Sequence, residues 1–134
     1  MPALTDTLTL NPRDAPPLRR SHALVVDDDQ DSREALAILL TWAGYDVVTA
    51  DNGADALMKA QSFRPQVIFL DIGMPEMSGY EVCRKLRKST TFQDARIYAL
   101  SGFTGAEHDT RCSEAGFTGQ FTKPIDPAVI PRLH

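Results

Sequence analysis

The sequence predicts an α/β fold built on a parallel sheet, and three observations support this prediction. Short apolar runs alternate with stretches of helical periodicity along residues 21–134. The central run, Val67–Leu70, is apolar at every position, as expected of a strand buried on both faces of a parallel sheet. Acidic, hydroxyl or basic residues stand where most of these runs end. We therefore expect five parallel strands with helices on both faces.

The first strand–helix pair shows how the elements are recognised. Residues 23–26 form an apolar run, and Asp31 with Glu34 fits the reciprocal capping box of a helix N-terminus. Gly44 suits the C-terminal end of that helix. Between them, apolar residues recur at helical spacing at Leu36, Leu39, Leu40 and Ala43.

The remaining elements follow the same alternation. Further strands are expected at residues 45–50, 67–70, 96–100 and 120–122. Further helices are expected to begin near Asn52, Ser78, Glu107 and Pro127. Pro131 falls about one turn inside the last helix, where proline removes a backbone donor, so we expect that helix to be short. A short last helix predicts an exposed apolar strip that a partner, a second copy or further sequence would cover.

Composition limits the classes of function. The chain has 134 residues and a net charge of −4, which suits one domain and disfavours a nucleic-acid-binding surface. Residues 1–20 contain four prolines and no apolar periodicity, so we expect a disordered leader before a single domain over residues 21–134. Cys83 and Cys112 are expected to be free thiols, and no apolar run is long enough to span a membrane. We expect a cytoplasmic protein.

Some side chains are expected to serve packing or solvation alone. We interpret Trp42 as a core residue. His22, His108 and His134 lack the spacing of metal ligands, and we expect them at the surface.

The polar residues at the strand ends predict a single site. Asp27 and Asp28 follow the first strand, Asp71 the third, Ser101 the fourth and Lys123 the fifth. Because the carboxyl ends of parallel strands meet at one edge, we expect these side chains to converge. Crowded carboxylates need a cation to remain ionised near neutral pH. Lys123 supplies one positive charge, and a divalent ion would supply the rest.

Mg²⁺ is the predicted ion because it prefers oxygen ligands and often binds through one or two carboxylates and a phosphate oxygen. Asp28 and Asp71 are the predicted direct ligands, with the backbone carbonyl of Gly73 as a third and Asp27 acting through water. Such a site favours a phosphoryl group, which a carboxylate can attack to form an aspartyl-phosphate.

Within this site we assign Asp71 as the nucleophile, Ser101 as a hydrogen-bond donor to the phosphoryl group and Lys123 as its ion-pair partner. A cis peptide between Lys123 and Pro124 would help to aim the lysine, and the sequence leaves that isomer open.

Four motifs carry a family resemblance: Val25–Asp28, Phe69–Gly79, Ala99–Gly102 and Phe121–Pro124. Together they make residues 21–127 resemble a response-regulator receiver domain of two-component signalling. The sequence of Ala99–Phe103 is similar to that of receivers attached to hybrid histidine kinases. We expect no output domain after Pro127, as in single-domain response regulators.

The resemblance implies a flavodoxin-like doubly wound sheet with strand order 2-1-3-4-5. It implies that a histidine kinase or histidine phosphotransfer protein donates a phosphoryl group to Asp71 in a Mg²⁺-dependent reaction. Ser101 and Lys123 would then sense that group, and a downstream protein target would read the surface near residues 102–116 and Gln120. We also expect that the chain can form a homodimer. The chain would be an autocatalytic phosphoacceptor rather than a dedicated enzyme.

The sequence departs from the receiver pattern at three positions. Gln120 stands where many receivers have an aromatic switch residue. Gly73, two residues after the nucleophile, has no side chain to orient a hydrolytic water, and Phe103 would shield the site. These features predict slow autodephosphorylation.

The same residues allow three other interpretations. A calcium loop at Asp27–Asp31 fails because Ser32 and Ile38 stand where glycine and a bidentate glutamate are needed. A haloacid-dehalogenase-type phosphatase would require an acidic residue where Gly73 stands. A receiver-like docking module that works without phosphorylation stays open.

Overall fold

The computed structural model describes residues 21–102 and 105–133, and it contains the predicted five-stranded parallel sheet. The strands are β1 (His22–Val26), β2 (Asp46–Ala50), β3 (Val67–Asp71), β4 (Arg96–Ser101) and β5 (Gly119–Thr122). The helices are α1 (Gln30–Trp42), α2 (Gly53–Phe63), α3 (Gly79–Arg87) and α4 (Ala106–Ala115), with short 3₁₀ helices η1 (Thr90–Phe92) and η2 (Pro127–Leu133). The sheet order is β2-β1-β3-β4-β5, so the predicted flavodoxin-like topology is confirmed.

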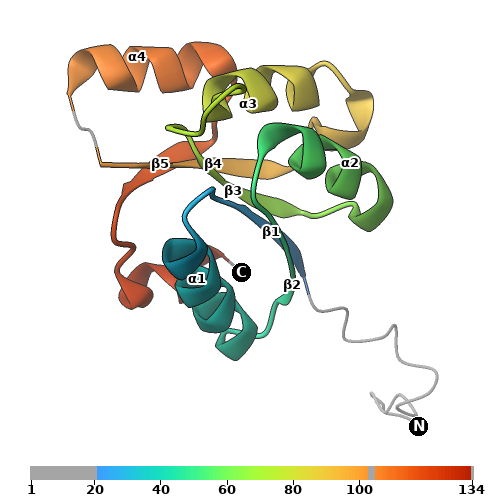
Figure 1. The fold of residues 1–134 in the computed structure, drawn as a ribbon, viewed down its shortest axis with the longest axis vertical. Helices are drawn as coiled ribbons and strands as arrows, with labels where there is room; N and C mark the ends of the chain where they lie inside the picture. The colour runs from blue at the N-terminus through green and yellow to red at the C-terminus, as the bar shows by residue number, and fades with distance from the viewer. Residues whose placement is uncertain (1–20, 103–104, 134) are drawn as a thin grey trace, which may run out of the picture.

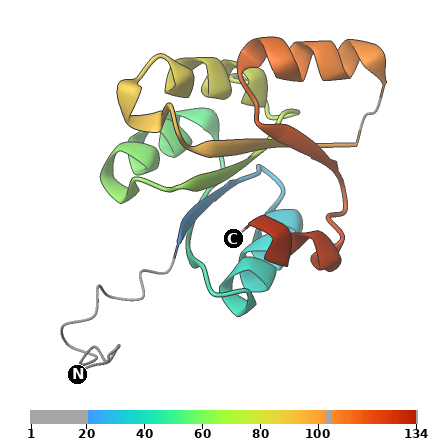
Figure 2. The same cartoon turned by 180° about the vertical axis from the view of Figure 1, so that it is seen from behind.

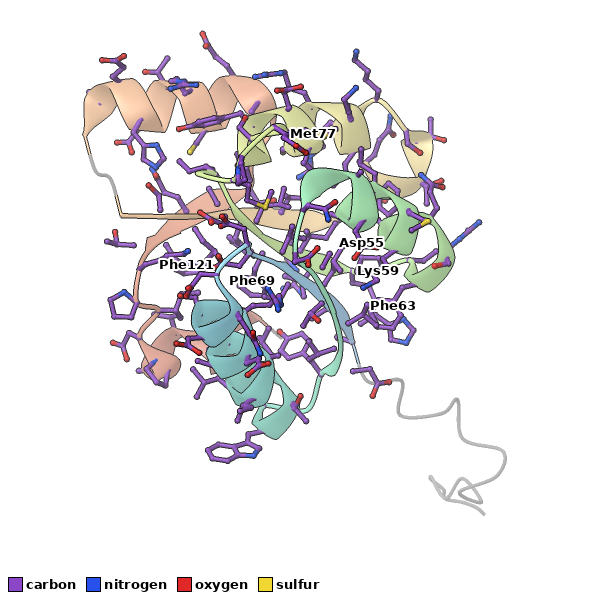
Figure 3. The ribbon with its side chains drawn as sticks, in the orientation of Figure 1. Asp55, Lys59, Phe63, Phe69, Met77 and Phe121 are labelled. Atoms are coloured by element: carbon purple, nitrogen blue, oxygen red, sulfur yellow. The ribbon has the colours of Figure 1, made fainter. Side chains whose placement is uncertain are left out.

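Helices cover both faces of this sheet. Helices α2, α3 and α4 lie on one face, and α1 with η2 lies on the other (Figures 1 and 2). Strand β3 occupies the centre, paired with β1 and β4, and Val67, Ile68, Phe69 and Leu70 are fully buried. Phe69 and Phe121 lie on the face toward α1, with ring centroids 6.3 Å apart (Figure 3). Every position of β3 is buried, which explains why the run of apolar residues is unbroken.

Helix N-termini follow the predicted caps in two cases and depart from the prediction in one. Asn52 and Ser78 accept hydrogen bonds from the amides of Asp55 and Glu81, as expected for α2 and α3. The prediction that Asp31 caps the first helix is wrong. Asp29 has the extended backbone of a cap, and its carboxylate accepts from the Ser32 amide at 2.9 Å, so Asp31 lies inside the first turn.

Two predictions of burial are also wrong. Trp42 is 80% exposed, because α1 turns Leu36 and Leu40 toward the sheet and Trp42 lies on another side of the helix. His108 is only 8% exposed, because it shares one face of α4 with Cys112 and Ala115. His22 is half-buried and stacks on the ring of Phe63 at 4.4 Å, while His134 and Phe103 lie outside the described residues, as does the expected leader.

The last helix is short, as predicted, and it is a 3₁₀ helix that begins at Pro127. The carboxylate of Asp126 accepts from the Ala128 amide at 2.9 Å, and Ile130 is buried in the core beside α1. A cavity of about 470 Å³ remains between α1 and the segment after β5, lined mainly by apolar residues such as Leu39 and Ile125. Its occupation by a partner or second copy stays a prediction.

The strand register brings the predicted site residues to one edge. Val26 lies opposite Leu70, Asp71 lies opposite Leu100, and Ser101 lies opposite Thr122. Asp27, Asp71, Ser101 and Lys123 therefore stand at or just beyond the same end of four neighbouring strands.

At the opposite edge of the sheet, an arginine that the sequence analysis did not single out connects α3 to the turns that precede β4 and β5. Arg87, the last residue of α3, donates hydrogen bonds to the carbonyls of Phe92 and Ala95 at 2.6 and 2.8 Å and to that of Gly116 at 2.8 Å. It also donates to the hydroxyl of Thr118 at 3.2 Å. The side chain thus holds the turns before β4 and β5 against α3.

We predict that Arg87→Met lowers the free energy of unfolding by about 2–4 kcal/mol, because the change leaves several partly buried carbonyls without a donor. Urea unfolding measures the loss. Arg84→Met, at an exposed position of the same helix, is the control and should change stability by less than about 0.5 kcal/mol. Equal losses in the two variants would contradict the assigned role of Arg87.

Candidate phosphoacceptor and metal site

Three carboxylates converge at the edge where β1 and β3 end. One oxygen each from Asp27, Asp28 and Asp71 lie within 4.8 Å of one another. Asp27 and Asp71 are buried and Asp28 is exposed, so the cluster opens toward solvent on one side. Hard oxygen donors at this separation fit a small divalent cation such as Mg²⁺. Among the described residues this is the only such group of three acidic, histidine or cysteine side chains.

Lys123 neutralises part of this negative charge. Its ammonium nitrogen lies 2.7 Å from a carboxylate oxygen of Asp27 and 3.5 Å from one of Asp71. Burial alone would lower the pKa of Lys123, but its contacts with Asp27 and Asp71 outweigh burial and raise that pKa. The lysine therefore stays charged. It reaches from the end of β5 to the carboxylates at the ends of β1 and β3. The peptide bond between Lys123 and Pro124 is cis.

The ionised form of Asp71 is destabilised by its surroundings. Burial raises the pKa of Asp71 to about 6, against the hydrogen bond from the Gly73 amide, and the neighbouring Asp27 acts in the same direction as burial. Lys123 opposes the rise. Asp71 is thus ionised at neutral pH and closer to its protonated form than an ordinary aspartate.

Backbone groups hold the loops around the carboxylates. The Gly73 amide donates to Asp71 at 3.1 Å, and the Asp29 amide donates to Asp27 at 3.0 Å. A Cβ added at Gly73 would meet only an Asp71 oxygen, at 3.7 Å, so the approach to the Asp71 carboxylate is open there. The role of the Gly73 carbonyl as a metal ligand stays a prediction.

Ser101 ends β4 beside this cluster and is 2% exposed. Its carbonyl accepts a hydrogen bond from the Lys123 amide at 2.8 Å, which ties the segment after β4 to the lysine. The hydroxyl and the ammonium predicted to hold a phosphoryl group thus lie on directly paired strands.

Arg33 is a site neighbour that the sequence analysis missed. Its guanidinium donates to the Asp27 carbonyl at 3.0 Å and fixes the start of the acidic loop. No local pattern identifies this contact, because it requires α1 to fold back over the end of β1.

The comparisons with known proteins agree with this geometry. Residues 23–133 match the model of the response regulator receiver domain family. The chain belongs to that family. This receiver domain is therefore a component of two-component signalling, and its fold has the arrangement seen in the family.

Individual relatives include both short and long proteins. PilG of Pseudomonas aeruginosa is 34% identical over a match that covers 76% of this chain and 76% of PilG. The transcriptional regulatory protein KdpE of Mycobacterium tuberculosis is 41% identical, but the match covers 76% of this chain and only 44% of KdpE. The chain therefore spans less than half the length of that relative.

Solved structures show the same architecture. The chemotaxis protein CheY4 of Vibrio cholerae superposes with a TM-score of 0.82 at 33% identity, over 86% of this chain and 96% of CheY4. Among the described residues of this receiver domain, no helix has the length and apolar character needed to cross a membrane.

We predict that Asp71→Asn raises the melting temperature at pH 7.5 by about 5 °C in the presence of a chelator. The pKa of Asp71 is about 6 in the folded chain against 3.8 for an unperturbed aspartate, so ionised Asp71 destabilises the folded state at neutral pH. The destabilisation by ionised Asp71 has its full value above pH 6. It falls as the pH drops toward 3.8, because the carboxyl group is then protonated in both the folded and the unfolded chain.

Thermal unfolding between pH 4 and pH 8 checks this prediction. The advantage of Asp71→Asn should shrink as the pH falls, and Asp94→Asn, at an exposed position, is the matched control. An advantage that grew toward low pH would contradict the assigned electrostatics.

Proposed function

We propose that this receiver domain is a phosphoacceptor and that Asp71 takes a phosphoryl group from a phosphohistidine in a Mg²⁺-dependent reaction. The observation that carries the proposal is the convergence of Asp27, Asp28, Asp71 and Lys123 at one sheet edge. A charged lysine beside a cluster of carboxylates suits a dianionic group with a divalent cation better than it suits a neutral substrate.

Each residue then has a defined task. The ionised Asp71 carboxylate attacks phosphorus, a bond forms between its oxygen and the phosphorus, and the bond to the donor imidazole breaks. The imidazole leaves with the bonding electron pair and becomes neutral histidine, because the other ring nitrogen of the donor carries a proton throughout. Lys123 pairs with a phosphoryl oxygen, and Ser101 donates a hydrogen bond to another. Mg²⁺ bound by Asp28, Asp71 and the Gly73 carbonyl, with Asp27 acting through water, would neutralise charge on the phosphoryl oxygens.

Asp27 has a further task that its burial suggests. It is 1% exposed and lies 2.7 Å from the Lys123 nitrogen, so it holds the ammonium in the site before any phosphoryl group arrives. Because Lys123 is farther from Asp71, at 3.5 Å, it can move toward a phosphoryl group without losing Asp27.

The proposed partners are a histidine kinase or histidine phosphotransfer protein as donor and a downstream protein as target. We place the output surface around α4 and β5, which lie beside Ser101 and Lys123. The chain acts on itself and is not a dedicated enzyme. The free, buried thiols of Cys83 and Cys112 suit a reducing compartment, which supports a cytoplasmic location. A docking module that works without phosphorylation is the alternative, and the complete acidic cluster favours the phosphoacceptor.

We predict that a small phosphodonor with Mg²⁺ adds one phosphoryl group to the wild-type chain. Intact-mass spectrometry detects the adduct. Asp71→Asn should abolish it, whereas the exposed control Asp94→Asn should behave as wild type. An adduct on Asp71→Asn, or one that forms equally well in a chelator, would contradict the assignment, and a folded wild type without an adduct would favour the docking module.

We also predict a slow loss of the phosphoryl group, because Gly73 offers no side chain to orient an attacking water. Since a Cβ fits at this position, Gly73→Gln should place an amide near Asp71 and shorten the phosphoryl lifetime by about tenfold. Gly73→Ala is the control that adds a side chain without a polar group. Decay of the wild-type adduct within seconds, measured by mass, would refute slow hydrolysis.

A further inference from the structure

Helix α4 is attached to its neighbours by a cluster of polar side chains that the phosphoacceptor chemistry does not use. We call this the α4 cluster. It consists of Tyr80 from α3, His108, Asp109 and Cys112 from α4, and Gln120 from β5.

Tyr80 and His108 form the buried centre of the α4 cluster. The Tyr80 hydroxyl lies 2.8 Å from Nδ1 of His108, and both residues are less than one-tenth exposed. The two rings meet edge to face with centroids 6.2 Å apart, and the Arg111 guanidinium lies 4.2 Å from the centroid of the Tyr80 ring. Burial makes this hydrogen bond costly to break without a replacement partner.

Gln120 extends the cluster from α4 to the edge strand. Its amide nitrogen donates to the carboxylate of Asp109, and its amide oxygen accepts from the Cys112 thiol at 3.8 Å. The Cys112 sulfur also lies 3.6 Å from Nε2 of His108. The hydrogen-bonded path therefore runs from α3 through α4 to β5.

Both ends of this path are fixed to the phosphoacceptor site. Tyr80 follows Gly79, where an added Cβ would lie 2.6 Å from the Asp71 carbonyl oxygen, so α3 begins in contact with the backbone of the acceptor strand. Gln120 lies in β5, and Lys123 directly follows the end of that strand, three residues after Gln120. The α4 cluster is therefore connected at one end to the backbone of Asp71 and at the other end to the strand that precedes Lys123.

The packing around α4 leaves room for it to move. A cavity of about 450 Å³ separates the loop after β3, at Gly73 and Ser78, from α4 at Glu107 and Arg111. Only His108, Cys112 and Ala115 of α4 are buried, so few apolar contacts hold the helix. Under these conditions a few polar contacts contribute a large share of what keeps α4 in position.

We propose that the α4 cluster is a latch that holds α4 in the unphosphorylated position, and that phosphorylation of Asp71 opens it. This inference rests on the proposed phosphoacceptor function. Coupling between two sites is reciprocal, so weakening the latch makes phosphorylation of Asp71 more favourable. A residue that only supports the fold would have the opposite effect or none.

The test combines hydrogen exchange of the α4 amides with the rate of phosphorylation by a small phosphodonor and Mg²⁺. Tyr80→Phe removes the buried hydroxyl, and Gln120→Ala, at an exposed position, cuts the link to β5 without disturbing the core. Tyr98→Phe is the matched control, because Tyr98 packs with Phe69 and Phe121 on the opposite face of the sheet.

In the unphosphorylated protein, both latch variants should increase exchange of the α4 amides by about fivefold, the effect of one hydrogen bond. Both should also phosphorylate about two- to fivefold faster than wild type, because a larger fraction of the chains is then in the conformation that accepts the phosphoryl group. Phosphorylation of wild type should raise exchange in α4 in the same way. Tyr98→Phe should leave both readouts at the wild-type level.

Three results would overturn the latch. The first is that the α4 amides of both latch variants exchange no faster than those of Tyr98→Phe. The second is that Gln120→Ala is phosphorylated more slowly than wild type. The third is an Asp71 adduct on wild type that leaves α4 exchange unchanged, which would remove the latch while the phosphoacceptor stands. A wild-type chain that forms no adduct would remove the phosphoacceptor and the latch together.

Discussion

The ion pair between Lys123 and Asp27 is the interaction on which the arrangement of the site depends. Asp27 is 1% exposed, and a carboxylate so deeply buried destabilises the fold unless a cation lies beside it. The cation comes from the segment after β5, which is separated from β1 by two intervening strands in the sheet. The strand order and register of this sheet bring the two charges to 2.7 Å.

The same constraint accounts for the unusual state of Asp71. Lys123 is shared between two carboxylates and lies closer to Asp27. Its ammonium nitrogen is 3.5 Å from Asp71, so the negative charge of Asp71 is only partly neutralised. Its pKa rises to about 6, chiefly because of burial. Asp71 is therefore a charge that a metal ion can stabilise further, whereas Asp27 already has its partner. This difference distinguishes Asp71, the proposed nucleophile, from its neighbour Asp27.

Much of the fold and site could be predicted because local patterns and chain order carry them. Val67–Leu70 is apolar at every position, and burial of β3 on both faces is the direct physical consequence. Asn52 and Ser78 cap helices through their own side chains, which needs no distant partner. Asp71 and Ser101 end strands, and Asp27 and Lys123 directly follow strands. Parallel strands end at one edge whatever the details of packing. The first helix shows the limit of such patterns, since Asp29 and Asp31 both suit a cap and the backbone selected Asp29.

The sequence by itself determined the fold class, the sheet edge that carries the site and the chemical types that meet there, because periodicity and strand ends are properties of neighbouring residues. Tertiary structure alone decided which side chains of similar character are buried. Trp42 faces solvent and His108 lies in a buried cluster, although a tryptophan suits a core and a lone histidine a surface. Arg33 and Arg87 likewise bond to carbonyls that only chain folding brings near. Burial depends on which elements pack together in space, and no local pattern contains that information.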